Sequence, residues 1–176
     1  MHVAVTAVGA DRPGIASAVA KILFEHGGNI EDSRMAILGG HFAMMLIVDL
    51  PADPAPAALE LALGPVAAAL DLIVAVRPVD EASAEGAGGT TYVVTVYGAD
   101  KPGIVYRVTE TLASHRVNVT DLATRVVPGD QPVYVMILEA TVPAAADAAI
   151  VEADLKALSA ELSVDVSFHP LDEETL

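Results

Sequence analysis

Apolar residues in the first half of the chain change their spacing several times, and each change predicts a new element. Residues 3–8 form a short β-rich run that predicts a strand. A helix is expected over residues 13–26, where apolar residues recur at helical spacing before a pair of glycines stops the pattern. Residues 30–38 and 41–50 predict two strands that form a hairpin through the intervening glycines.

The pattern then predicts a second helix over residues 57–70 and a last strand over residues 72–78. The resulting order, βαββαβ, is that of the ferredoxin-like split βαβ fold. Pro65 follows Gly64 inside the second helix, where a proline removes a backbone donor. We therefore expect a kinked or two-piece helix at this place.

The second half of the chain repeats the first. VTAVGADRPGI at residues 5–15 returns as VTVYGADKPGI at residues 94–104, with changes only at Ala7, Val8 and Arg12. The inward-facing residues of the second helix also recur at the same spacing, Leu59, Leu63, Val66 and Leu70 becoming Val151, Leu155, Leu158 and Leu162. The matching helix of the second copy has Ala157 in the region of the proline, so the kink is expected in the first copy only.

The repeat and the composition predict two domains. Residues 80–90 are small, polar and glycine-rich without any periodicity, which is typical of a flexible linker. The sequence thus predicts domains at residues 1–79 and 91–170, with a short tail at residues 171–176. The fold class is α+β: two tandem ferredoxin-like βαββαβ domains, each with an antiparallel sheet.

Charge and composition narrow the class of protein. The 176 residues are 53% hydrophobic and carry a formal net charge of −15, which disfavours direct binding of nucleic acid. Cysteine is absent, which excludes disulfides and thiolate chemistry. Neither a signal peptide nor an apolar run of about 20 residues is evident, so a cytoplasmic protein without membrane contact is expected. Any role in gene control would require a protein partner.

The repeated glycine-rich turn is the first candidate for ligand binding. The segment Gly9–Ile15 is expected to turn from a strand into a helix. The unpaired backbone N–H groups at the start of that helix favour a carboxylate or phosphate ligand. Gly14 would allow a ligand to approach the backbone closely. The alternative is purely structural: Asp11 caps the helix and the glycines serve the turn.

Other polar residues give weaker indications. Asn29 and Asn118 follow the first helix of each copy, where an asparagine amide could hold an amino or carboxyl group or could simply end the helix. His26 and His115 are expected to cap helix ends. The sequence contains no catalytic motif and no metal-ligand spacing. An acylphosphatase-like activity would want an arginine in the first loop, and Arg12 is replaced by Lys101 in the second copy.

These motifs resemble a known family. GADRPGI followed by NIEDSRMAILGGHFAMMLIVDLP is similar to the tandem ACT-domain regulators of the glycine cleavage system transcriptional repressor family, over essentially the whole chain. The resemblance implies paired ACT domains that bind amino acids at their interfaces near the turn, and action through a DNA-binding protein partner. The residues that it marks are Gly9, Ala10, Asp11, Pro13, Gly14, Ile15, Asn29 and Ile30, with Gly98, Asp100, Gly103, Ile104, Asn118 and Val119 in the second copy.

The sequence therefore predicts a regulator rather than an enzyme. A small amino acid such as glycine or serine would be sensed between ACT domains and would change the affinity for a protein such as a transcription factor. No cofactor and no metal is expected, and unprotected sheet edges favour a homodimer. The alternative is a structural pairing module that needs no ligand.

Overall fold

The computed structural model describes residues 1–51, 56–79, 88–130 and 132–171, and it divides the chain into two compact units. Unit 1 comprises Met1–Glu85 and unit 2 comprises Gly86–Leu176. Most of the linker predicted at residues 80–90 lies outside the described residues. Its last two residues belong to a strand, which begins at Gly89.

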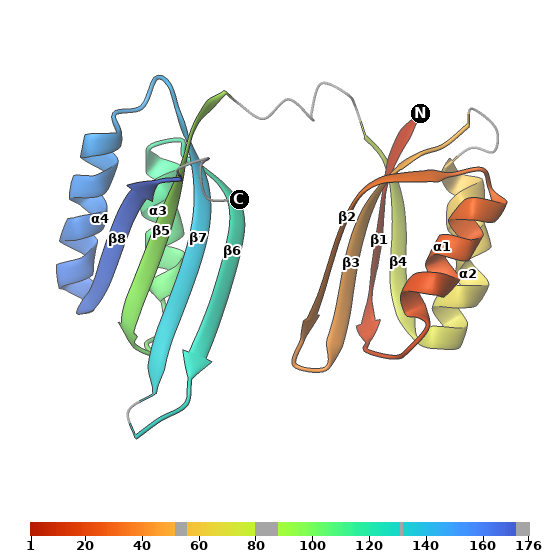
Figure 1. Cartoon of the computed structure of the whole chain (residues 1–176), viewed down its shortest axis with the longest axis horizontal. Coiled ribbons are helices and arrows are strands. Elements are labelled where there is room, and N and C mark those ends of the chain that lie inside the picture. Colours follow the sequence, from red (N-terminus) through yellow and green to blue (C-terminus); the bar gives the residue numbers. More distant parts are fainter. Residues whose placement is uncertain (52–55, 80–87, 131, 172–176) are drawn as a thin grey trace. The chain divides into compact units, whose positions relative to one another are not determined.

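Both units have the predicted βαββαβ order (Figure 1). The elements of unit 1 are β1 (His2–Ala10), α1 (Ile15–Glu25), β2 (Asn29–Leu38), β3 (His41–Asp49), α2 (Pro56–Leu70) and β4 (Leu72–Pro78). The elements of unit 2 are β5 (Gly89–Ala99), α3 (Ile104–Ser114), β6 (Asn118–Val127), β7 (Val133–Pro143), α4 (Ala148–Leu162) and β8 (Val164–Pro170). The α+β class with two antiparallel sheets is confirmed.

Each sheet has four antiparallel strands, ordered β2-β3-β1-β4 in unit 1 and β6-β7-β5-β8 in unit 2. The two helices of each unit cover one face of its sheet, and the other face is left open (Figure 1). This arrangement follows from the alternation along the central strands, in which every second residue is buried against the helices. Strands β2 and β6 each form one edge of their sheet.

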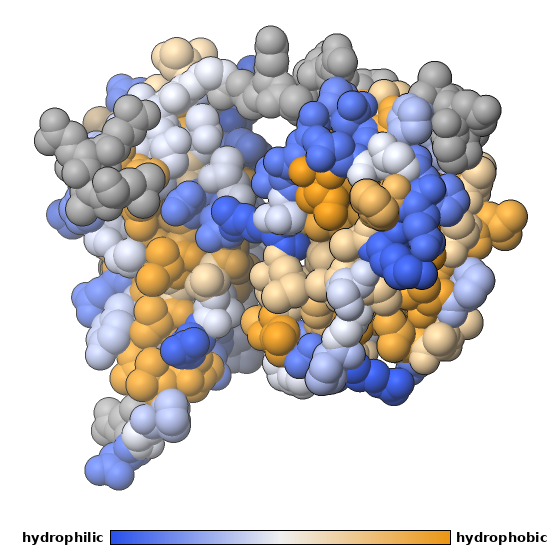
Figure 2. All heavy atoms as spheres, turned by 45° about the vertical axis from the view of Figure 1, so that its right-hand side comes forward, coloured by the Kyte–Doolittle hydropathy of each residue, from blue (hydrophilic) through white to orange (hydrophobic). Residues whose placement is uncertain are grey.

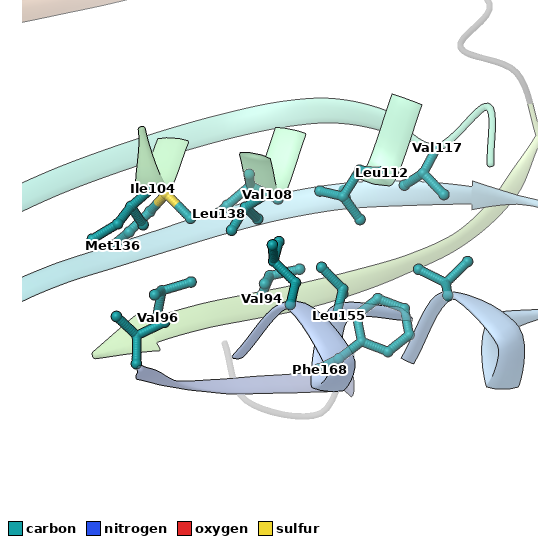
Figure 3. Packing of buried hydrophobic residues seen from close by; sticks show 14 of the residues in the cluster. Val94, Val96, Ile104, Val108, Leu112, Val117, Met136, Leu138, Leu155 and Phe168 are labelled. Atoms are coloured by element: carbon teal, nitrogen blue, oxygen red, sulfur yellow. The ribbon is translucent and has the colours of Figure 1, made fainter. Parts of the chain in front are cut away.

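Each unit has its own core of small aliphatic side chains. In unit 2, Ile104, Val108 and Leu112 from α3 lie against the inner residues of β5 and β7 (Figure 3). Unit 1 uses the matching positions Ile15, Val19 and Leu23. Periodic apolar residues thus form two separate cores, as the repeat predicts.

The hairpin predicted in unit 1 is confirmed. Gly39 and Gly40 both have positive φ, 57° and 79°, which a two-residue type I′ turn requires. In unit 2, the longer connection between β6 and β7 is described except for residue 131. A register shift between Ile30 and Asp32 recurs between Val119 and Asp121, so each edge strand carries a bulge near its start.

The sequence predicts a kinked or a two-piece helix at Pro65, and the two-piece form is wrong, because α2 continues through the proline from Pro56 to Leu70. A kink within the continuous helix stays a prediction. A proline at this position leaves the carbonyl of Leu61 without its helical donor. Leu61 and Pro65 both lie on the exposed side of α2, where water can bond to that carbonyl. Leu59 and Leu63 remain fully buried on the other side and hold the helix on the sheet.

Candidate functional site

The β1–α1 turn of unit 1 leads into a helix whose first N–H groups are not capped by any side chain of the described residues. Gly14 is the N-cap residue, with φ 96° and ψ −7°, and as a glycine it has no side chain that could cap the helix. The interpretation of Asp11 as the helix cap is therefore wrong: the left-handed glycine turns the chain between Asp11 and the first helical turn. Instead, the backbone N–H of Asp11 donates to the carbonyl of Gly40 at 2.9 Å, which fixes the turn to the β2–β3 hairpin.

The β5–α3 turn of unit 2 has the same geometry. Gly103 has φ 95° and ψ −6°, and again no side chain caps the helix. By contrast, Asp147 caps α4 in the ordinary way, because its Oδ1 accepts from the N–H of Ala149 at 2.9 Å. Helix α4 thus begins with a conventional side-chain cap. Helices α1 and α3 instead begin at exposed turns with uncapped N–H groups, which favour an anion.

Several predicted site residues of the two turns have structural roles: the glycines allow close packing, and the isoleucines fill the cores. Gly9 has no room for a side chain, since a Cβ would lie 2.6 Å from the carbonyl oxygen of Asp71. At Gly98 the same atom would meet Val164 Cγ1 at 2.8 Å. Ile15 and Ile104 point into the cores, so only their backbone can face a ligand.

Exposed residues complete each turn. Asp11, Pro13 and Gly14 are exposed in unit 1, and Ala10 is half-buried at the end of β1. In unit 2, Asp100 and Gly103 are exposed. Each turn therefore has an exposed carboxylate three residues before the N-cap glycine of its helix, and a carboxylate together with helical N–H groups suits a zwitterion with one negative and one positive group.

The predicted asparagines lie at the opposite end of the sheet from the turns. Asn29 pairs with Asp49 on β3, whereas Gly9 pairs with Phe42, seven positions away on the same strand. Since a strand rises about 3.3 Å per residue, roughly 23 Å separates the two places. Asn118 and Gly98 are similarly distant along β7. A single unit therefore does not bring its turn and its asparagine together.

A depression of about 550 Å³ in unit 2 lies between α3 and the start of β6, and Asn118 and Val119 are among its lining residues. Tyr106 and Glu110 line its helical side, where the Tyr106 hydroxyl donates to Oε1 of Glu110. That hydrogen bond is the first cause of a raised pKa at Tyr106. The volume suits a small ligand. In unit 1, Phe24 stands where unit 2 has the lining residue Ala113, and its side chain is 80% exposed.

Tyr134 on β7 is a polar residue of unit 2 that the sequence analysis did not single out. It is only 8% exposed, and its hydroxyl makes no hydrogen bond of normal geometry to the described residues. Burial raises its pKa, Thr124 opposes the rise and Asp100 in the turn adds to it. The pairing of Tyr134 with Gly98 places it beside the candidate turn. The repeat aligns Tyr134 with Phe42, so the sequence indicated only a core aromatic residue at this position and not a polar group.

Both histidines lie at helix ends as expected, but the ring of His26 contacts a carbonyl of its own helix, whereas the ring of His115 contacts a carboxylate on α4. His26 is the C-cap residue of α1, and its Nδ1 lies 2.8 Å from the carbonyl oxygen of Ile22. His115 occupies the same position on α3 and contacts Asp154 through Nε2 at 2.8 Å. Within the described ranges, no group of three or more His, Asp or Glu residues could hold a metal ion. None of the helices described there is long and apolar enough to cross a membrane.

Comparison with known proteins extends over nearly the whole chain. A family model described as ACT domain matches twice, at residues 1–77 and 90–169. The glycine cleavage system transcriptional repressors of Escherichia coli (strain K12) and Shigella flexneri are each 31% identical over 171 residues, which is 96% of this chain and 89% of theirs. A crystal structure described as that of an unknown protein from Galdieria sulphuraria matches with a TM-score of 0.83, 28% identity, and coverage of 97% of this chain and 98% of its own.

Proposed function

This chain is a tandem ACT-domain protein of the family that includes the glycine cleavage system transcriptional repressors, and we propose that it is an amino-acid-responsive regulator. Its ligand is a small amino acid such as glycine or serine, bound where one ACT domain meets another. It acts through a protein partner rather than by catalysis. The predicted domains, residues 1–79 and 91–170, are the two sensing modules.

The observation that carries the proposal is the pair of uncapped helix starts. Helices α1 and α3 begin at left-handed glycines, with N–H groups that no side chain caps in the part of the chain that the structure describes, while α4 has an ordinary cap. A ligand carboxylate would satisfy these N–H groups and interact with the helix dipole. The carboxylates of Asp11 and Asp100 would attract the ligand ammonium group.

The edge strands support an interface site. Every residue of β2 is exposed, and the strand lies at the edge of its sheet, where another strand can pair with it. Antiparallel pairing of two such edges places the start of one strand beside the end of the other. Asn29 begins β2, and the end of β2 adjoins the turn through the bond from Asp11 to Gly40. An asparagine of one ACT domain would thereby lie next to the turn of another domain, although the asparagine and the turn of a single unit are far apart.

The mode of action follows from the charge. At −15 the chain would repel phosphate groups, so contact with DNA would have to be made by another protein. The Escherichia coli relative, which matches along 96% of this chain, is described as a transcriptional repressor. A DNA-binding transcription factor is the partner that reconciles these two observations.

Calorimetric titration of the full chain with each of the twenty amino acids tests the proposal. We expect saturable binding of a small amino acid and none of the large aromatic ones. Asn29→Ala and Asp11→Ala should each weaken binding about tenfold or more, because a charged ligand group would lose a charge-assisted hydrogen bond. Asn118→Ala and Asp100→Ala report on the sites of unit 2 in the same way.

Glu60→Ala is the matched control for Asp11→Ala. It also removes one exposed carboxylate, but from α2, ten residues before Leu70 and so about 15 Å along the helix from the end that approaches the turn. Its affinity should equal that of the unaltered chain. Absence of binding by all twenty amino acids would contradict the sensing role and favour the ligand-independent pairing module.

A further inference from the structure

The open face of the unit 1 sheet is apolar at many positions that water can reach. Ile73, Met45 and Val8 all point away from the helices and are 78%, 49% and 45% exposed. Hydrophobic side chains are visible at the surface of both units in the space-filling view, which does not single out this face (Figure 2). Monomeric soluble proteins rarely expose a large contiguous apolar patch, so a partner surface is expected here.

The arrangement of large and small residues on this face indicates which partner fits. The strand order β4-β1-β3-β2 places one residue of each strand in a row across the sheet. A second copy turned by a two-fold axis parallel to the strands would exchange β1 with β3 and β4 with β2, while each row would face its own counterpart. Each row is therefore self-complementary if its β4 residue fits its β2 residue and its β1 residue fits its β3 residue across the two copies.

The row nearest the β1–α1 turn is Ile73, Val8, Ala43 and Ala36, in the order of the strands. Under the two-fold exchange, Ile73 would face Ala36 of the second copy. Val8 would face Ala43 of the second copy. Both large residues would thus meet alanines, and this row is self-complementary.

The next row is Ala75, Thr6, Met45 and Arg34. Here Met45 would face Thr6 of the second copy, and the long side chain of Arg34 would lie over Ala75. Again each bulky side chain meets a small one. This row packs without two large side chains in opposition.

The third row is Arg77, Ala4, Ile47 and Asp32. Ile47 would face Ala4, and Arg77 would face Asp32 of the second copy with the opposite charge. Within one copy, Arg77 and Asp32 stand at the two edges of the sheet, three strand spacings or about 14 Å apart. Their complementarity has a direct use only between copies.

The same exchange fails on the open face of unit 2. Tyr97 would face Val135, two bulky residues, and Val93 would face the carboxylate of Glu139. Ser167 and Ala123 would leave a gap, since both are small. Because the backbone topology of the two units is the same, the match in unit 1 is a property of its side chains and not of the fold.

The size of the face fits a specific but modest dimer. The open face has three rows of four side chains and, beyond the ends of β4, two rows of three. At about 30 Å² per position, from the spacing of residues and strands, these rows cover roughly 550–600 Å² in each copy, so two copies would bury about 1,100–1,200 Å². That value lies at the lower end of specific interfaces. We propose that the open face of unit 1 binds the same face of a second copy of this chain, about a two-fold axis parallel to the strands.

Sedimentation velocity of the full chain over a range of concentrations tests the proposal. We expect a reversible dimer. Ile73→Asp, which introduces the residue that unit 2 has at the matching position 165, should raise the dimer dissociation constant at least about tenfold, because it buries an unpaired charge. Ile137→Asp is the matched control on the open face of unit 2, where the replaced side chain is 50% exposed, and it should leave the constant unchanged.

A charge exchange gives an independent result that does not depend on apolar packing. Arg77→Asp and Asp32→Arg should each weaken the dimer, and the double variant should restore it to within about threefold of the unaltered chain. Circular dichroism verifies that each variant is folded. A chain that stays monomeric at 200 μM (about the upper range of such measurements), a dimer that Ile73→Asp leaves intact, or a double variant no better than the single ones would overturn the proposal. Amino-acid titration of the monomeric variant separates this result from the proposed sensing function.

Discussion

Units 1 and 2 share one backbone topology, but they differ in the side chains on their surfaces. Unit 1 has a glycine hairpin, an apolar open face and the exposed Phe24 on α1. Unit 2 has all four tyrosines of the chain, with the buried hydroxyl of Tyr134 beside its turn. It also has the depression that Asn118 lines between α3 and β6. The turn and the core positions are the parts that the two units keep in common. The comparison teaches that the fold requires those parts, whereas the surfaces around them are free to specialise.

The largest expected effect comes from breaking one core at a time. Leu23→Ala in unit 1 and Leu112→Ala in unit 2 each remove a fully buried side chain and should each lower the free energy of unfolding by about 2–5 kcal/mol. Since the units have separate cores, each variant should lose hydrogen-exchange protection only in its own unit. Tyrosine fluorescence reports on unit 2 alone. Equal loss of protection in both units would show that they unfold together.

The next effect compares Gly9 and Gly98, the two glycines before the turns that pack closely against a neighbouring strand. Gly9→Ala should destabilise unit 1 by about 1–3 kcal/mol, because the new Cβ would meet a backbone carbonyl oxygen that cannot move aside. Gly98→Ala should cost less, because its nearest contact is the Cγ1 of Val164 at 2.8 Å and the nearest backbone atom, the Cα of Val164, is 3.1 Å away. Chemical denaturation of both variants, followed separately in each unit, measures the difference. Equal costs would indicate that the side chain of Val164 is as immobile as the backbone.

A smaller effect is expected where the first helix of each unit ends. Gly27 has a φ of 71°, and the matching Arg116 has a φ of 59°, a left-handed conformation that strains a residue with a side chain. Arg116→Gly should therefore stabilise unit 2 by about 1 kcal/mol, and Gly27→Arg should destabilise unit 1. The midpoints of thermal unfolding test both changes. A destabilised Arg116→Gly variant would mean that the arginine makes a favourable contact that outweighs the strain.

The smallest effect is a difference in the response to alkali. Burial raises the pKa of Tyr134 above its ordinary value, so the folded unit 2 holds this proton more tightly than the unfolded chain does. The stability that this contributes is fully present below about pH 10, where the unfolded tyrosine is protonated, and it is lost as the pH rises through the folded pKa. Unit 2 should lose stability in this range.

Tyr134→Phe should reduce that loss and make unit 2 resemble unit 1, which has Phe42 at the matching position and no tyrosine. Tyr106 is the control, because its raised pKa arises first from a hydrogen bond to Glu110 on the surface, not from burial. Denaturation at a series of pH values from 8 to 11 (from about two units below to about one unit above the ordinary tyrosine pKa) measures each contribution. An unchanged alkaline response in Tyr134→Phe would assign the effect to the other tyrosines.

The amino-acid sequence by itself determined the number of units, their element order and their cores. Strand alternation and helical spacing are local patterns, and each identifies its buried face without reference to the rest of the chain. Ile15, Val19 and Leu23 could thus be assigned to the core from spacing alone. The repeated turn was likewise visible as a near-identical segment in both halves.

The roles of those segments depend on how the folded chain brings distant residues together. Asp11 has the residue type and position of a cap, but the left-handed Gly14 takes the cap position itself. Pro65 has the residue type of a helix breaker, but burial of Leu59 and Leu63 holds α2 in one piece. The distance between Asn29 and its turn, the orphan hydroxyl of Tyr134 and the self-complementary rows of the open face all depend on strand register. Register joins residues far apart in the chain, so no local pattern can specify it.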